Sequence, residues 1–189
     1  MPPELPEHEF ADQAAFATWL ADNAETSGLW LRIAKKGAGI ASVDHDQALE
    51  EALRHGWIDG TVRRVDDRYF AQKFVPRAKR SRWSAKNRAA AERLIAEGKM
   101  FPRGMAEVQA ARADGRWDAV YEGPAKATVP PDLAAALAAN PTAASFFATL
   151  TSQNRYAILY RVEEAKRAET RARRIEKFVG MLERGETLH

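Results

Sequence analysis

The chain has 189 residues, of which 46% are hydrophobic and 29% are charged, and its formal net charge is +3. This composition is ordinary for a globular protein, and the length allows one domain with a full core or two small domains. No apolar run approaches a membrane span, and the absence of cysteine excludes disulfides, thiolate nucleophiles and zinc sites built on cysteine. The first residues lack the basic start and apolar stretch of a secretory signal, so we expect a cytoplasmic protein.

The first third of the chain alternates helical and extended patterns. Apolar residues at helical spacing predict a helix over 12–23, and an apolar–polar period of two predicts a strand over 29–34. A second helix is expected to begin at Asp44, because Asp44 and Gln47 have the spacing of a capping box. Gly56 suits the C-terminal end of that helix.

The later elements follow from similar patterns. Two strands are expected over 57–65 and 68–75, joined by a tight hairpin at Asp66 and Asp67. Apolar spacing and breaks at Gly or Pro predict a linker over 122–130 and helices over 84–97, 102–114, 131–139 and 142–150. A last helical pattern starts near Ser152 and continues almost to the end, either unbroken or broken at Thr170.

These elements predict an α+β fold. We expect a small, mostly antiparallel sheet of about three strands with helices, followed by a helical C-terminal part. The predicted domains are an α+β domain over 10–121, which carries a basic loop, and a helical region over 130–189 packed on it. Residues 1–9 are rich in proline and polar side chains, and we expect them to be poorly ordered.

Basic residues are concentrated between Arg63 and Arg88. This segment holds ten Lys or Arg and two Asp, a net charge of about +8 against +3 for the whole chain. Like charges at this density repel one another, so we interpret the segment as a site for an anion. Its loop leads into the 84–97 helix, and a helix start offers free N–H groups and a partial positive charge.

The predicted ligand-binding residues lie in and beside this loop. They are Trp57, Asp59, Arg77, Lys79, Arg80, Arg82, Trp83, Ser84 and Asn87. We expect Arg77, Arg82 and Ser84 to converge on one spot at the helix start. The alternative is a solvated loop whose arginines pair with carboxylates, including those of residues 1–27, which hold six acidic and no basic side chains. For those N-terminal acids we favour simple solvation.

Several further residues have two interpretations. Asp59 either pairs with an arginine of the loop or acts as an acid or base in a pocket, and we favour the structural pair. His45 lies between Asp44 and Asp46 as in a metal cluster, but helix capping by Asp44 explains the pattern better. We therefore predict no metal site, no cofactor and no assigned catalytic residue. Trp57 and Trp83 are expected to be buried and to hold the hairpin against the 84–97 helix.

Several motifs taken together resemble the bacterial YdeI/OmpD-associated (bacteriocin-protection) family. The motifs are Gly56-Trp-Ile-Asp-Gly60, Pro76-Arg77 with Ser81-Arg-Trp-Ser84 and Asn87, Gly98-Lys-Met100 with Pro102 and Gly104, Gly115-Arg-Trp117, and Ala165-Lys166 with Glu169-Thr-Arg171 and Arg174-Ile175. The resemblance extends from about Leu29 to Leu182. It implies a bacterial protein linked by its family name to antimicrobial tolerance and an outer-membrane porin, without an established enzyme activity.

Three hypotheses for function remain open. The first is a non-enzymatic stress or antimicrobial-tolerance factor that binds a small anion or an acidic protein surface through the 77–88 loop. The second is nucleic-acid binding by the 63–88 segment, with Trp83, Phe70 and Phe74 as stacking surfaces. The third is an enzyme that uses Asp59 with the arginines. The oligomeric state does not follow from the sequence.

Overall fold

The structure is a computed structural model that describes residues 4–121, 123 and 127–188. The chain divides into two compact units, Met1–Tyr121 and Glu122–His189. Part of the predicted linker, residues 122 and 124–126, lies outside the described residues, as do residues 1–3 of the N-terminal segment. None of the helices in the described ranges is long and apolar enough to cross a membrane.

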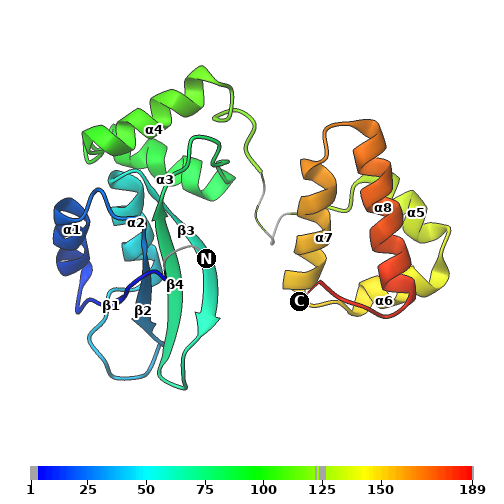
Figure 1. The fold of residues 1–189 in the computed structure, drawn as a ribbon, viewed down its shortest axis with the longest axis horizontal. Helices are drawn as coiled ribbons and strands as arrows, with labels where there is room; N and C mark the ends of the chain where they lie inside the picture. The colour runs from blue at the N-terminus through cyan, green and yellow to red at the C-terminus, as the bar shows by residue number, and fades with distance from the viewer. Residues whose placement is uncertain (1–3, 122, 124–126, 189) are drawn as a thin grey trace. The chain divides into compact units, whose positions relative to one another are not determined.

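The first unit combines a sheet with helices. Its elements in chain order are β1 (Glu7–Glu9), α1 (Gln13–Asp22), β2 (Leu29–Ala34), α2 (His45–Arg54), β3 (Trp57–Arg64), β4 (Tyr69–Pro76), α3 (Ala85–Ala96) and α4 (Pro102–Ala113). Figure 1 shows α1 and α2 beside the sheet and α3 and α4 at one end of it. The structure confirms the predicted α+β class and places most elements within one or two residues of their expected bounds.

The sheet has the strand order β1-β2-β4-β3. β4 pairs antiparallel with both β2 and β3, whereas β1 pairs parallel with β2. The expected count of about three strands was therefore too low, and residues 7–9 are ordered as a strand. Three residues with the sequence Glu-His-Glu carry no alternating pattern. Pairing alone makes them a strand, with the Trp30 amide donating to the Pro6 carbonyl at 2.8 Å.

The acidic N-terminal residues are not all simply solvated. Glu9 and Glu7 lie beside Arg32, at 3.0 and 3.6 Å, and Glu7 also pairs with Arg63 of the basic segment. Our preference for solvation was therefore wrong for these two side chains. The parallel pairing of β1 with β2 brings them across from Arg32, which no local pattern in the sequence indicates.

Two hydrophobic clusters form the core of the first unit, and α2 contributes to both. The cluster between the sheet and the first helices contains Phe16, Leu20, Leu29, Leu31, Ile33, Val43, Ala48, Ala52, Trp57 and Phe74. The cluster among the later helices contains Leu49, Leu53, Trp83, Ala91, Leu94, Val108, Ala111 and Trp117. Trp57 and Trp83 are 0% and 1% exposed, which confirms that both are buried. They belong to different clusters, so Trp83 and not Trp57 packs with α3.

The predicted helix ends are confirmed by their hydrogen bonds. The Asp44 side chain accepts from the Gln47 amide at 2.8 Å, and the Gln47 side chain accepts from the Asp44 amide at 3.1 Å, which completes the capping box. Gly56 has φ +77° directly after α2, a conformation that favours glycine. Ser84 caps α3, since its hydroxyl accepts from the Asn87 amide at 3.1 Å.

The second unit is helical. Its elements are α5 (Pro131–Ala138), α6 (Pro141–Thr149), α7 (Ser152–Glu164) and α8 (Ala168–Glu183). α8 contacts the other three helices, around a core that includes Leu133, Phe147, Ile158, Phe178 and Leu182. The last helical pattern is broken at residues 165–167, and Thr170 lies inside α8. Thr170 is therefore not the site of the break.

Gly104 allows α4 to lie directly against the end of α2. A Cβ atom at this position would be 2.4 Å from the Arg54 carbonyl oxygen and 2.7 Å from that of Leu53. Both obstacles are backbone atoms, which cannot rotate away as a side chain can. The contact therefore requires glycine, although Gly104 lies inside a helix, where glycine is otherwise unfavourable.

We predict that Gly104→Ala lowers the free energy of unfolding by about 1–3 kcal/mol, because the methyl group forces α2 and α4 apart. Gly180 in α8 is the matched control, since its added Cβ meets only the Arg184 side chain, at 3.6 Å. Gly180→Ala should be neutral or stabilising by up to about 1 kcal/mol. Urea denaturation of both variants measures the change in the free energy of unfolding. Equal changes would contradict the conclusion that the contact between α2 and α4 requires glycine at position 104.

Candidate functional site

The basic loop runs from the end of β4 to the start of α3. Its backbone is held at both ends, because the Arg77 amide donates to the Gly56 carbonyl at 3.0 Å and the Ala85 amide donates to the Tyr121 carbonyl at 3.0 Å. Ala78 and Ser81 close a turn between these points, with the Ser81 amide donating to the Ala78 carbonyl at 2.8 Å. The loop is thus a defined turn next to the N-terminus of α3.

Arg77 is buried beneath this loop. Its residue is 6% exposed, and its guanidinium carbon lies 3.5 Å from the centre of the Trp83 ring. Nη1 donates to the Arg82 carbonyl at 3.3 Å, whereas Nε and Nη2 are buried without a hydrogen-bond partner. Arg77 makes no ion pair within the part of the chain that the structure describes. The burial lowers the pKa of Arg77 to about 10, so the side chain still carries its positive charge at neutral pH.

The other predicted ligand residues take different positions. Lys79 and Arg80 are exposed on the outside of the loop, and neither forms an ion pair with any described residue. The Arg82 guanidinium lies 5.0 Å from the centre of the Tyr121 ring. The Ser84 hydroxyl is engaged in capping α3. Arg77 therefore lies under the loop, and the Ser84 hydroxyl faces α3. The convergence of Arg77, Arg82 and Ser84 on one spot at the helix start stays a prediction.

Much of the charge between Arg63 and Arg88 is compensated within the first unit. The ion pairs are Arg63 with Glu7, Arg64 with Asp67, Lys86 with Asp46, and Arg88 with Glu92 and Asp118. For these four cations, the structure therefore agrees with the alternative in which basic side chains pair with carboxylates. The cations of this segment that make no ion pair with a described residue include Arg68 and Lys73 in the hairpin as well as Arg77, Lys79 and Arg80 in the loop.

Asp59 pairs with a histidine. Its Oδ2 lies 3.4 Å from Nε2 of His45, which is the first residue of α2. The register places Asp59 opposite Phe74, so its side chain faces the helix side of the sheet, where α2 begins. The buried Asn87 side chain also hydrogen-bonds to Asp59. The favoured Asp59–arginine pair was therefore wrong, although Asp59 acts on Arg77 through its charge.

The charges around His45 favour its protonated form. The hydrogen bond to Asp59 raises the pKa of His45, and Asp46 contributes from the other ring nitrogen at 3.5 Å. Burial alone would raise the pKa of Asp59, but the hydrogen bonds from His45 and Asn87 and the charge of His45 together lower that pKa. Both shifts indicate that the charged forms, an imidazolium and a carboxylate, are favoured together. The sequence placed His45 next to a helix cap but gave no indication that β3 would bring Asp59 to it.

The burial of the aromatic rings bears on the nucleic-acid hypothesis. Trp83 and Phe74 are 1% and 0% exposed, so neither ring can stack on a base as the nucleic-acid hypothesis requires. Phe70 is only half-buried, but it packs against the sheet cluster. Across the described ranges, no group of three or more His, Cys, Asp or Glu side chains is arranged to hold a metal ion.

The fold and this site define a class: an α+β unit with a cationic loop over a buried arginine, followed by a helical unit. Residues 8–107, just over half of the chain, match the family model described as "Domain of unknown function (DUF8412)", and the chain belongs to this family. Residues 126–185 match the model described as "Bacteriocin-protection, YdeI or OmpD-Associated", which confirms the resemblance seen in the motifs. That match covers only the second unit, whereas the motifs up to Gly104 lie in the segment matched by the first model. No curated protein and no solved structure is significantly similar to the chain.

The His45–Asp59 pair predicts a measurable titration. The raised pKa of His45 contributes to the free energy of unfolding in full just below pH 6.5, and this contribution is lost as pH rises through the raised pKa. The contribution of the lowered pKa of Asp59 is lost as pH falls through that pKa. Asp59→Asn should lower the pKa of His45, since burial then acts without the charged partner. Asp46→Asn is the matched control and should lower it less, because Asp46 is exposed. NMR titration of the His45 ring checks both, and an unchanged pKa in Asp59→Asn would exclude the pair.

Proposed function

We propose that this protein is a non-enzymatic, cytoplasmic binding protein of antimicrobial tolerance that takes a small anion, or an acidic side chain of a partner, at the 77–88 loop. The description of the family matched by residues 126–185 supports the tolerance role. The absence of cysteine is compatible with a reducing compartment. The binding function rests on the geometry of the loop.

The observation that carries the proposal is the unpaired guanidinium of Arg77. A buried charge without a counter-ion costs several kcal/mol, and a buried donor without an acceptor costs about 1–3 kcal/mol. The Trp83 ring offsets a part of this through a cation–π contact. An anion would supply both the negative charge and the acceptors that Nε and Nη2 lack.

The surroundings of Arg77 suit an anion that enters through the loop. Lys79 and Arg80 attract it from the outside, and the N-terminus of α3 adds its partial positive charge next to the loop. Nε and Nη2 are covered in the free protein, so binding requires the turn over 78–81 to shift. The shift would break the hydrogen bonds within the turn and the one that Arg116 donates to the Ser81 carbonyl at 2.8 Å, but the exposed side chains of residues 78–80 mean that the core stays closed.

The buried position of Arg77 changes the choice of variant. Replacing this side chain with alanine would leave a cavity and destabilise the fold, so Arg77→Met is the better substitution because it keeps much of the volume. We expect Arg77→Met to leave the free protein about as stable as the wild type or more so, because it removes an unpaired buried charge. The anion response should disappear.

Thermal melts across phosphate, sulfate, citrate and nucleotides, with chloride at matched ionic strength, test the site. An anion at 100 times its dissociation constant should stabilise the wild type by about 2.7 kcal/mol. Lys79→Ala/Arg80→Ala should weaken this response and Arg77→Met should abolish it. Lys36→Ala/Arg68→Ala is the matched control, since it removes the same charges from exposed positions near the opposite end of β4. Equal responses in all four proteins would mean a generic salt effect and would refute the proposal.

A further inference from the structure

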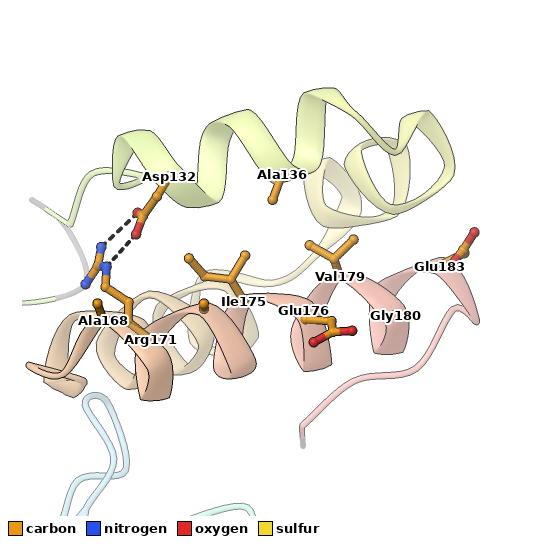
Figure 2. Close-up of a pocket in the computed structure, with 10 residues that line it drawn as sticks. Asp132, Ala136, Ala168, Arg171, Ile175, Glu176, Val179, Gly180 and Glu183 are labelled. Carbon is orange, nitrogen blue, oxygen red and sulfur yellow. Dashed lines mark hydrogen bonds and ion pairs between the residues drawn. The ribbon is translucent and has the colours of Figure 1, made fainter.

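The second unit has a long groove between α5 and α8. Its volume is about 590 Å³, within the range of roughly 300–1,000 Å³ typical of ligand pockets. Figure 2 shows its side chains arranged along the two helices, from the Asp132–Arg171 pair at one end to Glu183 at the other. The lining residues are Asp132, Ala136, Ala168, Arg171, Ala172, Ile175, Glu176, Val179, Gly180 and Glu183.

The groove is open because the two helices present small side chains to it. Ala136 lies on α5, and Ala168, Ala172 and Gly180 lie on α8, where larger side chains would fill the space. Ile175 and Val179 form the apolar wall, and Ile175 is 8% exposed because its other side belongs to the helical core. Packed interiors leave few voids larger than a water molecule. The groove is much larger than such a void and is lined by exposed residues, so it belongs to the surface of the unit.

The two ends of the groove differ in charge. At one end, Arg171 donates to both carboxylate oxygens of Asp132, and its Nη1 donates to the Val162 carbonyl at 2.8 Å. This pair is neutral and ties α8 to α5 and α7. Glu176 and Glu183 are exposed along the rest of the groove, and neither makes an ion pair with a described residue. The open part of the groove is therefore apolar at its floor and negative at its rim.

The spacing of the two glutamates matches a helix. They are seven residues apart on α8, which is about 10.5 Å along the helix axis and two turns of a partner helix. A small-molecule site would have a few polar groups converging on one point. Here the charged groups lie at the ends and the rim, and the apolar residues run between them. This arrangement suits an extended apolar ligand with positive charges at its edge.

We propose that the groove binds an amphipathic helix of a partner protein, whose apolar stripe fills the space between α5 and α8. Lys or Arg residues spaced seven apart at the edge of that stripe pair with Glu176 and Glu183. Laying an amphipathic helix into an apolar groove is a common mode of peptide recognition. The charge of the rim selects a cationic helix and opposes an anionic one. This site is independent of the anion site in the first unit.

A pair of synthetic peptides of about 16 residues, the length of α8, tests the proposal on the full chain. Both carry a leucine stripe, and they differ only in having Lys or Glu at two edge positions seven residues apart. Fluorescence anisotropy should show that the Lys peptide binds and that the Glu peptide binds roughly tenfold or more weakly. Circular dichroism should show helix formation when the Lys peptide binds.

Variants of the protein make the test specific for the groove. Glu176→Lys/Glu183→Lys should reverse the preference, so that the Glu peptide binds better than the Lys peptide. Glu163→Lys/Glu169→Lys changes the charge equally at exposed positions that do not line the groove, and should bind like the wild type. Ala172→Phe should block both peptides by filling the groove, and the exposed position of Ala172 keeps the fold intact.

The remaining outcomes overturn the proposal. Equal binding of both peptides would mean non-specific hydrophobic contact, and an unchanged preference in Glu176→Lys/Glu183→Lys would place the binding elsewhere. Absence of binding at millimolar peptide would exclude a helix site. Light scattering covers the last alternative, because a wild-type dimer that Ala172→Phe dissociates would show that a second copy of this chain occupies the groove.

Discussion

Helix α2 is the element on which the first unit depends. Its buried residues are divided between the two clusters, with Ala48 and Ala52 packed toward the sheet and Leu49 and Leu53 toward the later helices. A shift of this helix would disturb both clusters at once, so its ends must be fixed. The capping box at Asp44 fixes the beginning, and the positive φ of Gly56 fixes the turn into β3. The positions of the candidate site residues follow from these two ends.

The beginning of α2 places His45 against Asp59, and its end places Gly56 where the carbonyl accepts from the Arg77 amide. The first contact joins α2 to β3, and the second joins the turn after α2 to the start of the basic loop. The charges of Asp59 and Arg77 have different surroundings. The His45–Asp59 pair is compensated locally. Arg77 makes no ion pair with a described residue, and its charge is supported by the Trp83 ring, the Arg82 carbonyl and the charges of Glu107 and Asp59. A buried charge without an ion pair is costly, which is the reason for proposing an anion site at this position.

The two units differ in the chemistry of their surfaces. The first presents a cationic loop, and the second presents an apolar groove with a negative rim. The two family matches follow the same division, since residues 8–107 lie in the first unit and residues 126–185 lie in the second. Each unit also has its own hydrophobic core. The proposed anion and the proposed helical partner would therefore bind to different units.

The sequence by itself determined the α+β class, most helices and strands, the caps at Asp44 and Ser84, and the burial of Trp57 and Trp83. These features depend on local spacing, on capping side chains and on large apolar rings, which act over a few residues. Only the tertiary structure decided that Glu7 pairs with Arg63, that Asp59 meets His45 and that Arg77 is buried. Each of these depends on strand register or on which helix covers which face. Such contacts join residues far apart in the chain, and their partners leave no periodic pattern in the sequence.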